Sequence, residues 1–159
     1  MVKEILLIGD PRLYDVSEEV KKDEIESIKP IIDDLHDTLL AFRNKWGYGR
    51  AIAAPQIGAL KRILYMNIDH AVPMINPVLT FPDDEMMEVL DDCMSFPNLF
   101  VRVMRYKRAV ISYKNLEWED CSMELEGDLS ELLQHEYDHL DGILATMKAI
   151  DNKSFQMKR

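Results

Sequence analysis

The residues with the clearest capacity for chemistry lie in a short run near the end of the sequence, which reads QHEYDH at positions 134–139. On an α-helix, residues four positions apart share one face. His135 and His139 can therefore direct ring nitrogens at one metal ion while Glu136 lies beside them. This spacing is typical of hydrolases in which a metal activates water and a glutamate transfers protons. The run predicts a single-metal hydrolytic site.

The hydrophobic pattern around this run predicts that its polar side chains point toward the core. At about 100° per residue, apolar positions share one arc with Glu136 and His139, and His135 lies at the edge of that arc. Burying three such groups is costly unless they are paired or coordinated, and a metal ion removes that cost. A chance match on a solvated helix is the alternative, which the inward placement disfavours. The positions on the arc are Leu129, Leu132, Glu136, His139 and Ile143.

A catalytic metal site needs a third protein ligand and keeps one position for water. In zinc proteases with this motif the third ligand lies downstream, but beyond His139 the sequence has no Glu, His or Cys. We therefore expect the ligand upstream. Cys93 is favoured because a strand there gives way to a loop limited by proline. The other candidates are His36, expected at a packing boundary, His70, expected in a solvated turn, and Cys121, expected as a small buried side chain.

The bulk composition limits the class of protein. A length of 159 residues predicts one domain over 1–159. The net charge of −10 argues against general nucleic-acid binding, which needs a basic surface. The apolar run at 5–8 is too short for a signal peptide or a membrane span, so we expect a cytoplasmic protein without membrane contact. Two cysteines give no disulfide framework.

Periodicity predicts an α+β fold, with mixed or antiparallel strands grouped between an N-terminal helix and the C-terminal helix that carries the two histidines. Pro30 is expected to kink the first helix or to mark its start. Asp128 is expected to cap the second helix in a capping box with Glu131, and Gly142 to end or bend it. The first helix is expected at 25–42, and the strands at 62–68, 74–80 (bent or at an edge because of Pro77), 86–90, 99–113 and 118–125.

Three motifs extend this interpretation. They read GRAIAAPQ at 49–56, DDCMS at 91–95 and QHEYDHLDG at 134–142. They resemble, in order, the G-x-G-L-A-A-P-Q, E-G-C-L-S and Q-H-E-x-D-H-L-x-G motifs of the peptide deformylase family. The resemblance runs over nearly the whole sequence and is far more specific than the histidine spacing alone.

The resemblance implies an enzyme that removes the formyl group from N-formylmethionyl peptides and nascent proteins. It implies that Cys93, His135 and His139 hold one divalent metal ion. Fe²⁺ is the ion expected in the cell, and Zn²⁺, Ni²⁺ or Co²⁺ can substitute for it. A formylated peptide or nascent chain is the expected substrate, and the ribosome is a candidate partner.

The resemblance also assigns roles to three further groups. Glu136 takes the proton of the attacking water and passes it to the leaving amine. The side-chain amide of Gln56 and the backbone N–H of Met94 stabilise the developing oxyanion.

Several positions depart from the family pattern. Ala51 replaces the second glycine of the first motif, and Asp91 replaces glutamate, although it can still pair with Arg105. Asp92 replaces glycine beside the expected ligand, and Phe100 stands where many members have arginine.

These departures keep two alternatives open. The first is a related amidase that acts on another N-acyl substrate, because Arg50, Asp92 and Phe100 can reshape the rim of the peptide site. The second is a non-catalytic, metal-stabilised homologue in which Asp92 closes the fourth coordination position.

Overall fold

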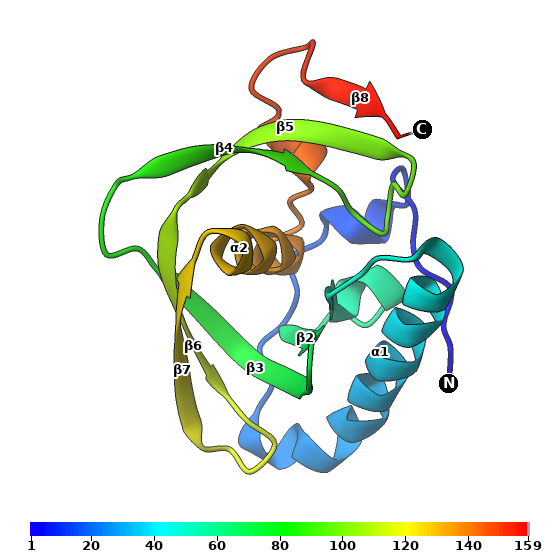
Figure 1. Cartoon of the computed structure of the whole chain (residues 1–159). Helices are drawn as coiled ribbons and strands as arrows, with labels where there is room; N and C mark the ends of the chain where they lie inside the picture. Colours follow the sequence, from blue (N-terminus) through cyan, green and yellow to red (C-terminus); the bar gives the residue numbers. More distant parts are fainter. Residues whose placement is uncertain (159) are drawn as a thin grey trace.

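The computed structural model describes residues 1–158 and places the helix with the two histidines at the centre of the molecule (Figure 1). The α+β prediction is confirmed, with two short strands that the sequence did not indicate, one at 51–53 and one after the second helix at 155–157. The helices are α1 (Ile25–Trp46) and α2 (Asp128–Leu140), and the strands are β1 (Ala51–Ala53), β2 (Ile63–Asn67), β3 (Ala71–Thr80), β4 (Met86–Asp91), β5 (Leu99–Tyr106), β6 (Arg108–Lys114), β7 (Asp120–Glu126) and β8 (Phe155–Met157).

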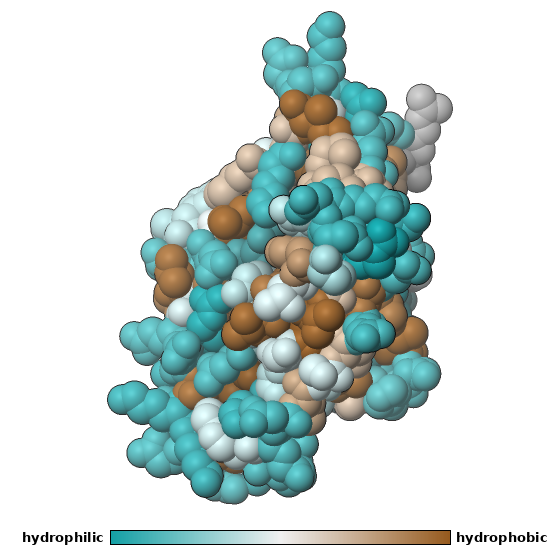
Figure 2. Space-filling model, turned by 90° about the vertical axis from the view of Figure 1, so that its left-hand side faces the viewer, coloured by the Kyte–Doolittle hydropathy of each residue, from teal (hydrophilic) through white to brown (hydrophobic). Residues whose placement is uncertain are grey.

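The named strands form two antiparallel sheets. One sheet has the order β1-β2-β3-β6-β7, and the other has the order β4-β5-β8. Helix α2 packs against strands of both sheets, whereas α1 covers β1 and β2 from outside (Figure 1). The face over β4 to β7 carries hydrophilic side chains at its margins with hydrophobic ones between them (Figure 2). Within the described residues, no helix is long and apolar enough to cross a bilayer.

The stretch at 99–113 is two strands rather than the single strand predicted. The strand is interrupted at Lys107, and the two resulting strands, β5 and β6, belong to different sheets. Gln134 satisfies the backbone at this break, because its side chain accepts from Tyr106 N–H at 3.0 Å and donates to Tyr106 C=O at 2.8 Å. A residue of the QHEYDH run therefore has a structural partner at the corner between the sheets.

Helix α1 and strand β3 show how proline was accommodated. Pro30 lies inside α1, which starts earlier, at Ile25, and extends to Trp46. In β3 the register shifts between Ile75 and Val78, which confirms the bend expected at Pro77. Because β3 lies between β2 and β6, the proline occupies a bulge in an internal strand and not an edge.

Helix α2 is more deeply buried than its apolar arc predicts. It is buried along most of its circumference, since Ser130, Gln134 and Asp138, which lie on the side away from the predicted arc, are buried too. The predicted capping box is wrong: Gly127 is the N-cap, no side chain caps the helix, and Asp128 is exposed. Glu131 instead lines a cavity beside the histidines. Tertiary packing has overridden the local capping signal.

The turn after α2 depends on Gly142, whose φ is +72°. A Cβ atom there would lie 2.4 Å from the carbonyl oxygen of Tyr14, which is a backbone atom and not the end of a flexible side chain. We expect Gly142→Ala to lower the free energy of unfolding by about 2–4 kcal/mol, from the unfavourable φ and the clash together. Urea denaturation measures this loss.

The matched control is Gly47→Ala, where φ is +80° but no atom lies within 4 Å of the added Cβ. This variant should lose only about 1–2 kcal/mol. Equal losses at both positions would show that the approach of Tyr14 does not constrain the turn.

Candidate metal centre

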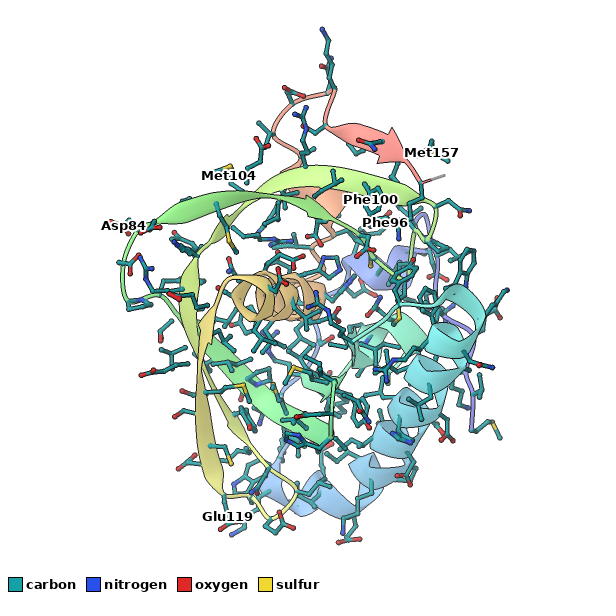
Figure 3. The ribbon with its side chains drawn as sticks, viewed as in Figure 1. Asp84, Phe96, Phe100, Met104, Glu119 and Met157 are labelled. Atoms are coloured by element: carbon teal, nitrogen blue, oxygen red, sulfur yellow. The ribbon has the colours of Figure 1, made fainter. Side chains whose placement is uncertain are left out.

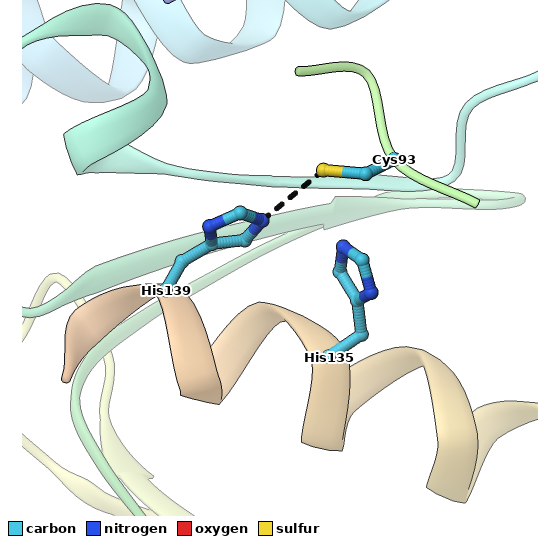
Figure 4. A group of neighbouring side chains, drawn as sticks. All are labelled: Cys93, His135 and His139. Atoms are coloured by element: carbon cyan, nitrogen blue, oxygen red, sulfur yellow. Dashed lines mark hydrogen bonds between the residues drawn. The ribbon is translucent and has the colours of Figure 1, made fainter. Parts of the chain in front are cut away.

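Cys93, His135 and His139 come together as the sequence predicts. One ligand atom from each lies within 4.8 Å of the others, and all three residues are buried. The two histidines project from α2 on successive turns, and Cys93 reaches them from the loop after β4 (Figure 4). The Cys93 Sγ lies 3.3 Å from His139 Nε2. A sulfur and two imidazoles in this arrangement suit a divalent transition metal.

The orientation of His135 is set by Asp91. His135 Nδ1 lies 3.0 Å from Asp91 Oδ2, which leaves the other ring nitrogen for the ligand cluster. Burial alone would raise the pKa of Asp91, but His135 and Arg105 outweigh it and hold that pKa below its ordinary value. A carboxylate behind a ligating histidine fixes the ring and increases its basicity. The pairing of Asp91 with Arg105 that the sequence suggests is present at 2.8 Å.

Arg105 connects the two segments that carry the ligands. Its guanidinium donates to Asp91 at 2.8 Å and to Asp138 at 2.7 Å. Only 1% of its side chain is exposed. Asp91 precedes the Cys93 loop, and Asp138 belongs to α2. One buried cation therefore fixes the position of the loop relative to the helix.

Glu136 lies beside the ligand cluster and is buried. Among residues 1–158, its Oε2 atom has no hydrogen-bond partner. Burial raises the pKa of Glu136 to about 7. A carboxyl group with a pKa near neutrality can both accept and return a proton.

Gln56 and Met94 also lie at the site. Gln56 follows β1 in a short 3₁₀ helix (Ala54–Ile57), and its Oε1 accepts from Ala53 N–H at 3.0 Å. This bond directs its Nε2 toward the Cys93 loop, 3.1 Å from Ser95 Oγ and 3.6 Å from Cys93 Sγ. Met94 is buried and lines the cavity next to Cys93. The structure therefore brings together the six residues singled out from the sequence.

Asp92 does not belong to the ligand cluster. Its carboxylate instead accepts from Lys158 Nζ at 2.8 Å. The same ammonium group lies 3.8 Å from the ring centroid of Tyr48 and 4.8 Å from that of Phe100. Phe100 and Met157 lie at one end of the molecule, on the paired strands β5 and β8 (Figure 3). The pairing of Asp92 with Lys158 argues against the alternative in which Asp92 fills the fourth coordination position of the metal.

The other candidate ligands lie elsewhere. His36 bonds to Tyr65 OH at 2.5 Å, and His70 is exposed beside Asp69. Cys121 is half-buried on β7, where a fully buried side chain was expected. Ala51, which replaces a family glycine, is a strand residue without positive φ, so the added methyl causes no backbone strain.

A cavity of about 490 Å³ opens onto Cys93, His135 and Glu136. Its wall includes Glu131, which the sequence interpretation assigned to helix capping. Glu131 lies four residues before His135, so the same helical spacing that paired the histidines could have placed it at the site. Burial and the neighbouring Asp91 raise the pKa of Glu131 to about 8.

The fold and this set of donor groups fit the class of metal-dependent hydrolases that use one histidine pair and one cysteine. The family model described as polypeptide deformylase matches residues 2–155. The chain is 34% identical over 151 residues to the peptide deformylase of Treponema pallidum, covering 94% of this chain and 89% of that protein. It is 35% identical over 141 residues to that of Thermotoga maritima, covering 88% and 82%.

Solved structures agree with these relatives. The crystal structure of the Thermotoga maritima peptide deformylase matches with a TM-score of 0.85 and 32% identity, covering 95% of this chain and 99% of that one. A class I type b peptide deformylase from Acinetobacter baumannii matches with a TM-score of 0.84 and 29% identity, covering 92% and 99%. The chain belongs to the peptide deformylase family, whose known function is metal-dependent deformylation.

The buried Arg105 network should be a large contributor to stability. Arg105→Leu would leave Asp91 and Asp138 buried without their cation. We expect the variant to lose about 3–5 kcal/mol of unfolding free energy, as is usual when one partner of a buried ion pair is removed. Urea denaturation provides the measurement. Arg108→Leu, which removes a half-buried arginine with its ion pairs at the surface, is the control and should lower the free energy of unfolding far less. Similar losses would contradict the role given to Arg105.

The raised pKa of Glu131 predicts a pH-dependent cost. A carboxyl group with a higher pKa in the folded state binds its proton more tightly there, so its contribution to stability falls as pH rises from about 4.5 to about 8. Glu131→Gln cannot titrate. The free energy of unfolding of the variant, taken relative to that of the parent protein, should therefore rise by at least about 1 kcal/mol from pH 5 to pH 8. Urea denaturation of both metal-free proteins at pH 5 and at pH 8 tests this prediction. A difference in unfolding free energy between the two proteins that does not change with pH would contradict it.

Proposed function

We propose that this protein is a metal-dependent deformylase that removes the N-formyl group from N-formylmethionyl peptides and nascent proteins. The observation that carries the proposal is the buried group of Cys93, His135 and His139, with the enclosed carboxyl of Glu136 beside it. Membership of the peptide deformylase family supports the same reaction.

The donor groups fit one divalent ion. Cys93 supplies a sulfur, and His135 is already oriented by Asp91 as a metal-binding histidine would be. An ion bound by these atoms would polarise the formyl carbonyl and lower the pKa of the attacking water. Fe²⁺ is the ion we propose for the cell, and Zn²⁺, Ni²⁺ or Co²⁺ can substitute, because this ligand set accepts each of them.

Glu136 is the proton-transfer residue in this proposal. The hydroxyl part of a water molecule adds to the formyl carbon, and Glu136 takes the proton. The carbon–nitrogen bond then breaks, and the same proton passes to the leaving amine. The products are a free N-terminus and formic acid, which ionises to formate at neutral pH. The burial of Glu136 supports this role because it raises the pKa of the carboxyl to about 7, and such a group exchanges protons in both directions at neutral pH.

Gln56 and Met94 are the groups that would stabilise the oxyanion. The anchored amide of Gln56 presents its N–H₂ group next to Cys93, and Met94 follows Cys93 directly on the cavity wall. Donors that are fixed before the reaction stabilise developing charge without reorganisation.

The cytoplasm is the proposed site of action, since nascent chains are formed there. A formylated nascent chain is the proposed partner, with the ribosome as a candidate docking site. We assign no role to nucleic acid or membrane contact.

Formate release from formyl-Met-Ala peptides tests the proposal. Protein loaded anaerobically with Fe²⁺ or Ni²⁺ should release formate, and Glu136→Gln should slow release at least about 100-fold because the proton carrier is lost. Glu124→Gln, an exposed glutamate on β7, is the matched control and should retain activity. Chelation should abolish release, and added metal should restore it. Release that survives Glu136→Gln at full metal occupancy would overturn the assigned role.

A further inference from the structure

Asp92 places a carboxylate beside the metal-binding group. It comes directly before Cys93 in the chain, and it lines the same cavity as His135 and Glu136. It stands where the family motif has glycine, so this chain has an additional potential ligand next to a site that must keep one position for water. Carboxylate oxygens bind the same divalent ions as thiolates and imidazoles. An unrestrained Asp92 would therefore compete with water for that position.

The restraint on Asp92 comes from Lys158, which lies far along the chain. The Lys158 Nζ atom donates to Asp92 Oδ2 at 2.8 Å, and the lysine side chain is only 17% exposed. The ammonium group also lies 3.8 Å from the ring centroid of Tyr48 and 4.8 Å from that of Phe100. Aromatic faces attract a cation at these distances. The ammonium group is therefore fixed by more contacts than the exposed ion pairs that contribute little to stability.

The backbone around Lys158 is anchored as well. Strand β8 pairs with the first three residues of β5, and Lys158 N–H donates to Asn98 C=O at 2.9 Å. All three side chains of β8 are exposed, so the strand adds no side chain to the core. Its pairing with β5 places Phe100 and Met157 at the same end of the molecule (Figure 3). The segment thus delivers one ammonium group to the residue that precedes Cys93.

We propose that Lys158 is a positioning residue that holds the Asp92 carboxylate away from the metal ion and so keeps the fourth coordination position available to water. The inference rests on the proposed deformylase function and adds to it a residue outside the three sequence motifs. Lys158 acts only through Asp92 and touches no reacting atom. Without its ammonium group, Asp92 becomes a fourth protein ligand, and the site changes from an open catalytic site to a closed one.

Lys158→Met tests the proposal, because it keeps an unbranched side chain against the two rings and removes the charge. With an added anionic ligand, the variant should bind Co²⁺ at least about 10-fold more tightly than the parent protein in competition with a chelator. Acetohydroxamate, which needs an open position on the metal, should bind the Co²⁺ protein at least about 10-fold more weakly. The visible absorption of Co²⁺ reports this binding, and kcat for formyl-Met-Ala should fall with it. Weaker Co²⁺ binding would indicate general damage to the site and overturn the proposal.

Three further variants assign the effect to the pair. Asp92→Ala/Lys158→Met removes the competing carboxylate as well, so its Co²⁺ affinity, acetohydroxamate binding and kcat should return close to those of the parent protein. Lys158→Arg keeps the cation and should behave like the parent. The matched control is Lys153→Met, at an exposed lysine just before β8, which should change none of these quantities. A double variant that behaves like Lys158→Met would overturn the role given to Asp92.

The two binding measurements separate this inference from the proposed function, because neither depends on the reaction. Formate release by the parent protein, together with unchanged Co²⁺ and acetohydroxamate binding in Lys158→Met, would overturn the role of Lys158 and leave the deformylase function intact. Absence of formate release from the fully metal-loaded parent would refute the proposed function. The two binding measurements would still decide whether Lys158 keeps Asp92 off the metal.

Discussion

The site depends on one buried cation, Arg105, and on the two carboxylates that neutralise it. Asp91 lies at the end of β4, just before the Cys93 loop, and Asp138 lies on α2. A guanidinium with 1% exposure is tolerable only because both acids are present, and the acids in turn require the cation. This mutual requirement brings the thiol of one segment to the histidines of another and turns His135 toward them through Asp91.

The rest of the fold makes this arrangement possible. Arg105 is on β5. At Lys107 the chain crosses from the sheet that contains β5 to the sheet that contains β6. The backbone freed at that corner is satisfied by Gln134 on α2, one residue before His135. The helix is thus enclosed between two sheets, and Glu131, His135 and Glu136 line a single space on one side of it. That space accounts for the raised pKa of Glu136, which is caused mainly by burial.

Local patterns in the sequence predicted the helices, most strands and the placement of His135 and His139 on one helix face, because each has a signal within a few residues. The family motifs added the clustering of Cys93 with the histidines and the pairing of Asp91 with Arg105. The patterns failed where distant contacts decide. The break at Lys107 is satisfied by Gln134, strand β8 forms by pairing with β5, and Glu131 lies against the cavity instead of capping α2. The partner of Asp92 was also missed, since Lys158 lies 66 positions along the chain.

X-ray absorption spectroscopy of the protein loaded with one equivalent of Zn²⁺ tests the central claim most directly, because it reports the atoms bound to the metal. The arrangement of Cys93, His135 and His139 predicts one sulfur at about 2.3 Å and two imidazole nitrogens at about 2.0–2.1 Å. Cys93→Ser should lose the sulfur contribution. A first shell without sulfur in the parent protein, or one unchanged by Cys93→Ser, would contradict the account.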